Sequence, residues 1–186
     1  MGNINQLVTC LLLGSLVGCS QPIIQNTSLS PSSSSSSSSS SESYISDRKL
    51  YDAGKYEQLE QRLKAKTNPN YEVNSSEDVM NLFRLAHVKY KIAERDNDFG
   101  NPMVRTYGSA EHIYGELYSN VPFKFLGSDS ARAGAMFGRA AAHLRREKVE
   151  NLEIVESALR GVILNAGFDL KSSLKYVEDP HFLFGK

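Results

Sequence analysis

The sequence predicts an all-α protein of about three antiparallel helical hairpins, packed as an array or a bundle, after a disordered serine-rich linker. From Ser46 onward, apolar residues recur three and four positions apart, which is the spacing of one face of a helix. No run of four to eight residues alternates strictly between apolar and polar types, as a half-buried strand would. Glycines such as Gly54 and Gly167 separate the helical stretches and act as turn signals.

Length and charge limit what the folded part can be. The first 43 residues do not resemble a core, which leaves roughly 143 residues, enough for one ordinary domain. The 21 basic and 21 acidic residues balance, and none of them precedes Glu42, so this domain carries no formal net charge. A protein that binds nucleic acid by neutralising phosphates needs a basic surface, so we expect no nucleic-acid partner.

A secretory signal is expected at the N-terminus. Residues Leu7 to Val17 form a mostly apolar stretch of 11 residues, which suits the hydrophobic region of a signal peptide and is too short to span a bilayer. Its end, Leu16-Val17-Gly18-Cys19, resembles the lipobox of bacterial lipoproteins. The resemblance implies that residues 1–18 are removed and that Cys19 becomes the first mature residue. Cys19 would then carry two or three acyl chains, enough for stable membrane anchoring.

The segment before the apolar stretch departs from that family. Met1 to Gln6 contains no Lys or Arg, so the positive charge of the signal depends on the amino terminus alone. An ordinary secretory signal and a buried helix that ends in Gly18-Cys19 are therefore the alternatives. N-myristoylation of Gly2 is disfavoured, because Gln6 stands where that motif has Ser or Thr.

Processing at Cys19 has two further implications. Cys10 would leave with the signal peptide, so the mature chain would have no second thiol for an intramolecular disulfide. Ser20 stands where an Asp would retain a lipoprotein in the inner membrane under the sorting rule of diderm bacteria. We therefore expect lipid anchoring in the bacterial cell envelope, at the outer membrane if the organism has one.

A flexible linker is predicted for residues 19–43, ahead of the helical domain at 44–186. Ser, Pro, Asn and Gln dominate it from Gln21 onward, and Ser32 to Ser41 is an unbroken run of serine. Such a composition cannot bury enough apolar surface to offset the entropy lost on ordering. As a random coil it would hold the domain about 25 to 30 Å from the membrane on average. We interpret it as a spacer, with a glycosylation target as the alternative.

Six helices are predicted in the domain. The strongest covers residues 76–95, where Ser75 and Ser76 supply the N-cap and Glu77 and Asp78 an acidic first turn. The helices fall into three pairs joined by short connections: 46–53 with 56–66, 76–95 with 104–118, and 130–147 with 151–165.

These pairs resemble tetratricopeptide repeats. Gly54 followed by Tyr56 is similar to the turn of that family, in which Gly ends the first helix and an aromatic residue opens the second. Further matches to the family's small, aromatic and proline positions are Ala110, Tyr114, Leu117, Pro122, Phe137, Gly138 and Ala141. The resemblance implies stacked hairpins that bury faces which none could bury alone. The loop at 96–103 makes the second pair longer than the family's period, and an unrelated helical bundle is the alternative.

The sequence contains no recognisable catalytic motif. Neither a nucleophile elbow nor a phosphate-binding loop occurs, and acylation would block the thiol of Cys19. The four histidines lack the spacing of metal ligands: His87, His112, His143 and His181. We therefore predict no catalytic residue, no metal and no cofactor. A pair of carboxylates brought together by folding would not be visible in the sequence, so an enzyme stays an alternative.

Two clusters are candidates for partner binding. Arg132, Arg139 and Arg146 lie seven residues apart and so form one stripe along the predicted helix at 130–147. Guanidinium groups bind carboxylates of a protein or of peptidoglycan, although a solvated helix face is the simpler interpretation. The second cluster consists of three tyrosines, a residue type common at interfaces but also in cores: Tyr107, Tyr114 and Tyr118.

Together these features favour a membrane-anchored envelope lipoprotein that acts as a helical-repeat adaptor for protein-protein interaction. The expected partners are the membrane, through the lipid, and an envelope protein, as in assembly of a secretion, pilus or outer-membrane machine. This inference is an analogy at the level of the fold. An envelope enzyme or a regulator of cell-wall remodelling is one alternative, and a passive surface lipoprotein is the other.

Overall fold

The computed structural model describes residues 39–96 and 104–185, with side chains from 46 to 96 and from 107 to 185. Within these ranges all regular structure is α-helical, which confirms the all-α prediction. The described residues from 41 onward belong to one compact unit. The predicted signal peptide, Cys19 and the predicted linker up to residue 38 lie outside the described residues.

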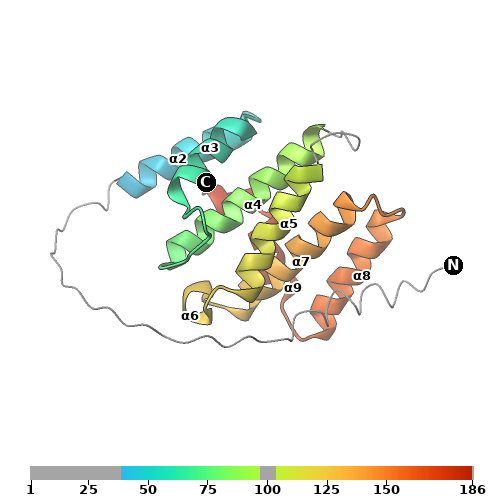
Figure 1. Cartoon of the computed structure of the whole chain (residues 1–186). Helices are drawn as coiled ribbons and strands as arrows, with labels where there is room; N and C mark the ends of the chain where they lie inside the picture. Colours follow the sequence, from blue (N-terminus) through green and yellow to red (C-terminus); the bar gives the residue numbers. More distant parts are fainter. Residues whose placement is uncertain (1–38, 97–103, 186) are drawn as a thin grey trace. The chain divides into compact units, whose positions relative to one another are not determined.

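Nine helices make up the described part of the chain (Figure 1). In order they are α2 (Ser39–Asp52), α3 (Tyr56–Lys66), α4 (Ser76–Asp96), α5 (Val104–Ser119), α6 (Phe123–Leu126), α7 (Asp129–Arg146), α8 (Leu152–Asn165), α9 (Leu170–Glu178) and α10 (Pro180–Phe184). None of them is both long enough and apolar enough to cross a membrane.

The first hairpin consists of α2 and α3, which are antiparallel. Tyr51, near the turn, lies with its ring centroid 5.4 Å from that of Tyr56, while Asp47, further from the turn, pairs with Lys66 at 2.6 Å. Gly54 makes the turn possible because its φ is +66°, a conformation that side chains disfavour.

The other two predicted pairs are also antiparallel hairpins. In α4 and α5, the ring centroids of Tyr90 and Tyr107 lie 5.3 Å apart. Phe83, further from that connection, faces Tyr114 at 6.4 Å. In α7 and α8, a guanidinium of α8 lies over an aromatic ring of α7. Gly167, just after the end of α8, has a φ of +84° and turns the chain.

Two close approaches join α7, the first helix of the third hairpin, to α5 and to α9. A Cβ on Gly138 would lie 2.8 Å from ring atoms of Tyr114, so this glycine lets α7 pack directly against α5. A Cβ on Gly134 would collide with the carbonyl oxygen of Ser173, so a second glycine admits α9. Small residues therefore set the spacing of α5, α7 and α9.

Predicted and observed helix bounds agree to within one residue except at α2. That helix begins at Ser39 rather than at Ser46, so the last part of the predicted linker is helical. Serine has only a moderately lower helix propensity than alanine, so a serine run does not stop a helix whose later turns are packed. Three short helices, α6, α9 and α10, were not predicted.

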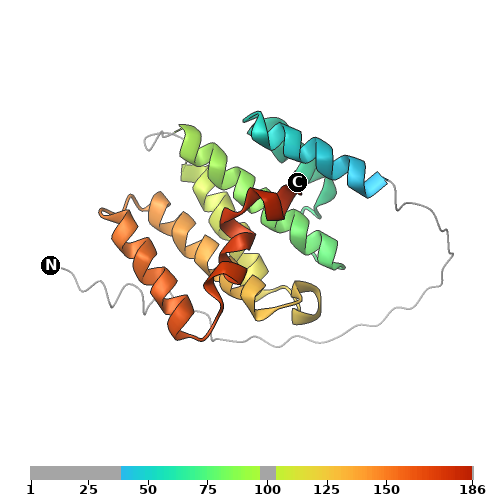
Figure 2. The same ribbon diagram turned by 180° about the vertical axis from the view of Figure 1, so that it is seen from behind.

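The C-terminal segment, defined here as residues 170–185, crosses the first helix of every hairpin (Figure 2). Ser173 meets Gly134 of α7, and the carbonyl of Val177 is bonded to His87 of α4. Phe184 stacks on Tyr51 of α2, with ring centroids 4.9 Å apart. The segment thus connects α2, α4 and α7, which are far apart in the sequence.

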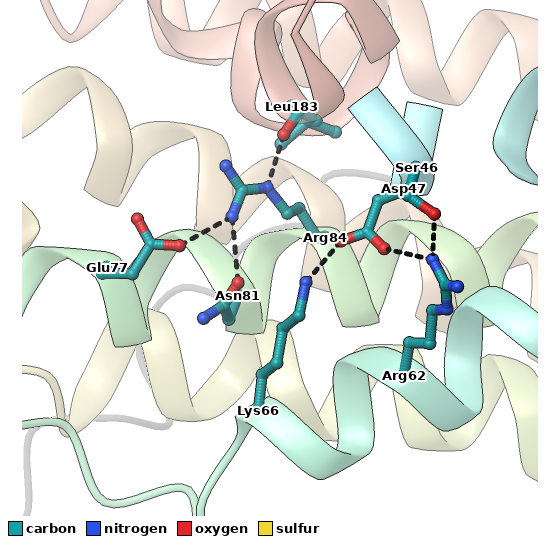
Figure 3. A network of polar contacts seen from close by, with 8 residues as sticks. All are labelled: Ser46, Asp47, Arg62, Lys66, Glu77, Asn81, Arg84 and Leu183. Carbon is teal, nitrogen blue, oxygen red and sulfur yellow. Dashed lines mark hydrogen bonds and ion pairs between the residues drawn. The ribbon is translucent and has the colours of Figure 1, made fainter. Parts of the chain in front are cut away.

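Buried charges sit where α2, α3, α4 and α10 meet (Figure 3). Asp47 is 1% exposed and pairs with Lys66 at 2.6 Å and with Arg62 at 3.6 Å. Arg84 of α4 donates to the carbonyl of Leu183 and to Asn81. Since a buried charge without a partner is strongly unfavourable, these contacts fix how the C-terminal segment meets the hairpins.

Candidate anion-binding groove between α5 and α7

The three arginines of the predicted stripe lie on one face of α7, and all are half-buried. Arg132 donates to the carbonyl of Val121 at 3.2 Å. Arg146 pairs with Glu111 of α5 at 2.8 Å and with Glu147 at 2.8 Å. Arg139, midway between them, makes no hydrogen bond or ion pair with any residue that the structure describes. The three arginines of the stripe therefore lie in three different environments.

Glycines on α5 make room for the arginine side chains. A Cβ on Gly115 would lie 3.7 Å from Cδ and Nε of Arg139, and one on Gly108 would lie 3.8 Å from Cδ of Arg146. The long aliphatic stems therefore lie across bare helix backbone, and this covers apolar surface while the guanidinium groups stay near water.

A polar groove of about 340 Å³ results between α5 and α7. The arginines line one side, and side chains of α5 line the other. Its complete lining is Gly108, Glu111, His112, Gly115, Glu116, Ser119, Asn120, Arg139 and Arg146.

The charges in this groove are not equivalent. Glu111 is already neutralised by Arg146, and Glu116 accepts a hydrogen bond from the side-chain amide of Asn120 at 2.6 Å. Arg139 alone keeps its donors unused within the described structure. A planar guanidinium matches the two oxygens of a carboxylate or phosphate, so the groove can hold one anionic group at Arg139.

The three predicted tyrosines do not line this groove. Tyr107 is 5% exposed, and Tyr114 is completely buried beneath α7. Tyr118 is half-buried and packs against the core. Burial raises the pKa of Tyr107 and of Tyr114 above the ordinary value, so both stay neutral. In the observed structure Tyr107 and Tyr114 contribute to packing and present no ring to a partner.

The α5 side of the groove was not predicted from the sequence. Gly108 and Gly115 are seven residues apart, the same interval that separates Arg132, Arg139 and Arg146. Matching intervals on two helices, with glycine on one and a long side chain on the other, are the signal that could have revealed the pairing.

The histidines occupy unrelated positions. His87 is buried, and burial lowers its pKa to about 4. His143 lies 3.2 Å from Glu111, His112 faces the groove, and His181 contacts Arg48. Among the described residues, no three His, Cys, Asp or Glu side chains gather as metal ligands would.

Comparison with known proteins gives no assignment. The chain matches no protein-family model, and neither a curated protein nor a solved structure is similar to it. The resemblances of Leu16-Val17-Gly18-Cys19 to a lipobox and of the helix pairs to tetratricopeptide repeats stay predictions from the sequence alone.

Proposed function

We propose that this chain is a lipid-anchored protein of the bacterial envelope whose helical domain is a protein-interaction adaptor. The observation that carries the adaptor role is Arg139, a half-buried arginine without an ion pair in the described structure, which lies in an open polar groove. The groove would receive an acidic side chain or a carboxyl terminus of the partner. Membrane attachment follows from the resemblance of Leu16-Val17-Gly18-Cys19 to a lipobox.

The geometry favours recognition of a single acidic group over a large anionic surface. Of the two arginines that line the groove, Arg146 is engaged by Glu111, which leaves one guanidinium fork for a ligand. A charge-assisted hydrogen bond to a partly buried arginine contributes about 1.5 to 3 kcal/mol. Such a contact supplies specificity, while the surrounding surface must supply the remaining affinity.

The test expresses the full chain in a diderm host and crosslinks intact cells. Four chains are compared: the wild type, Cys19→Ser, Arg139→Gln, and Arg95→Gln as a matched control. Arg95 is 40% exposed and pairs with Glu57 and Asp96, away from the groove. Mass spectrometry records the N-terminal peptide and the covalent partners.

We expect the wild type to begin at acylated Cys19 and to capture one specific envelope protein. Cys19→Ser should lose membrane attachment, and Arg139→Gln should stay attached but lose at least about 90% of the captured partner, as the loss of 1.5 to 3 kcal/mol requires. An unmodified Cys19 contradicts the anchor. Equal capture by the Arg139→Gln and Arg95→Gln chains contradicts the groove, and capture of no partner favours a passive surface protein.

A further inference from the structure

A second cavity, separate from the groove, lies on the opposite side of α7. It measures about 190 Å³ and is walled by α4, α7, α8 and α9. Phe137, Ala141 and Val177 give it an apolar side. Tyr90 and Arg145 bring hydrogen-bond donors to the same cavity. The adaptor role proposed above makes no use of this space.

The charged groups at its edge are mostly paired with one another. Lys91 pairs with Glu94 at 2.5 Å, and Glu178 pairs with Arg160 at 2.5 Å. Arg145 is different, because its nearest carboxylate oxygen, on Glu156, lies 3.6 Å away. That separation is an ion pair by distance but is longer than a good hydrogen bond.

One buried donor at this cavity, Nε of Arg145, has no hydrogen-bond partner among the residues that the structure describes. A buried donor left unpaired costs about 1 to 3 kcal/mol, so an acceptor at this position would be stabilising.

Tyr90 adds a second donor. Burial raises the pKa of its hydroxyl, and the nearby guanidinium of Arg145 only partly opposes this rise, so the hydroxyl stays protonated. A guanidinium beside a neutral phenol can donate to both oxygens of a carboxylate at once. The guanidinium cannot accept a hydrogen bond, and its positive charge repels a cation.

We propose that this cavity binds a small monocarboxylate with a short apolar body. The carboxylate would lie against Arg145 and Tyr90, and the body against Phe137, Ala141 and Val177. The volume suits one ring or a short branched chain and not a polymer. A dianion such as phosphate is disfavoured more strongly than a monocarboxylate, because Glu94, Glu156 and Glu178 line the same cavity and Arg145 already pairs with Glu156.

The test titrates benzoate and isovalerate into the detergent-solubilised full chain and follows binding by calorimetry and by NMR shifts of the protein. Benzyl alcohol serves as the neutral analogue of benzoate and also reports partition into detergent. The variants are Arg145→Gln, which removes the donor, and Arg139→Gln, the same change on the other side of α7. Ala141→Val, which narrows the cavity and leaves every polar group in place, is the second variant.

We expect saturable binding of at least one carboxylate, with benzyl alcohol at least about tenfold weaker, as one lost charge-assisted hydrogen bond requires. Arg145→Gln should weaken binding by a similar factor, Ala141→Val should weaken it too, and Arg139→Gln should leave it unchanged. If Arg145→Gln does not fold, weaker binding by Ala141→Val supports the proposal and unchanged binding overturns it. Absence of saturable binding, or equal binding by benzoate and benzyl alcohol, overturns the proposal without affecting the adaptor role.

Discussion

The imidazole of His87 donates through Nδ1 to the carbonyl oxygen of Val177, 2.6 Å away and 90 residues later in the chain. Its other nitrogen, Nε2, lies 3.0 Å from the hydroxyl of Tyr51 and accepts from it. One neutral ring therefore connects α2, α4 and α9. Protonation would turn Nε2 into a donor and would remove this acceptor.

This histidine should make stability depend on pH. Burial lowers the pKa of folded His87 to about 4, below the 6.5 of an exposed histidine, so the unfolded chain binds the proton more readily. The contribution of His87 is fully present above about pH 6.5 and is lost as pH falls toward 4, by on the order of 3 kcal/mol. Chemical denaturation between pH 4 and 7 measures the slope. His87→Asn should be less stable at pH 7 and should show a shallower slope; an unchanged slope would contradict the assignment.

Two helical glycines should respond to alanine in opposite directions. At Gly138 the new Cβ would lie 2.8 Å from the ring of Tyr114, so Gly138→Ala should destabilise the fold by about 1 to 3 kcal/mol. At Gly161 nothing lies within 4 Å, so Gly161→Ala should stabilise α8 by about 0.5 to 1 kcal/mol. Urea denaturation of both variants checks this: an unchanged stability of Gly138→Ala would argue against the close packing of α5 and α7, and a loss in Gly161→Ala would argue against the open surroundings of Gly161.

Substitutions of Asp47 and Asp52 compare the contribution of a buried ion pair to stability with that of an exposed ion pair on the same helix. Asp47 is 1% exposed and bonds to Lys66, whereas Asp52 is 53% exposed and pairs with Arg48. Asp47→Asn should cost about 1 to 3 kcal/mol, because it leaves a buried contact incomplete. Asp52→Asn should cost less than about 1 kcal/mol. Thermal unfolding distinguishes the two, and equal losses would mean that α2 is not packed as described.

Arg84 should hold the C-terminal segment in place. Arg84→Met keeps the length of the side chain but leaves the carbonyl of Leu183 without its donor, at a cost of about 1 to 3 kcal/mol. Hydrogen exchange of amides in residues 170–185 should accelerate, while exchange in α5 stays slow. Arg95→Met on the same helix is the control, because Arg95 is 40% exposed and contacts no part of the segment described here. Unchanged exchange in Arg84→Met would show that the apolar contacts suffice.

Local signals predicted the helices well. The observed bounds of α3 equal the predicted ones, and Gly54 and Gly167 both adopt a positive φ at predicted turns. Each of these features depends on neighbouring residues, so spacing and turn chemistry are sufficient to find it.

The C-terminal segment could not be placed in the same way. Its buried residues, Leu174, Leu183 and Phe184, occur in helices too short to give a clear periodicity. Their partners, such as Tyr51, lie more than a hundred positions earlier, and a single sequence contains no record of that contact. Only the α7 side of the groove was predicted, for a related reason. The stripe of arginines is a local feature of α7, whereas its pairing with α5 depends on residues distant in the sequence.

The stacking of Phe184 on Tyr51 also orders events during synthesis. The first hairpin leaves the ribosome early, but one face of α2 stays uncovered until residues 180–184 have been made. During that interval the ring of Tyr51 can pack on Tyr56 and His87 but lacks its stacking partner Phe184. The hairpin made first is therefore among the last parts of the chain to become fully packed.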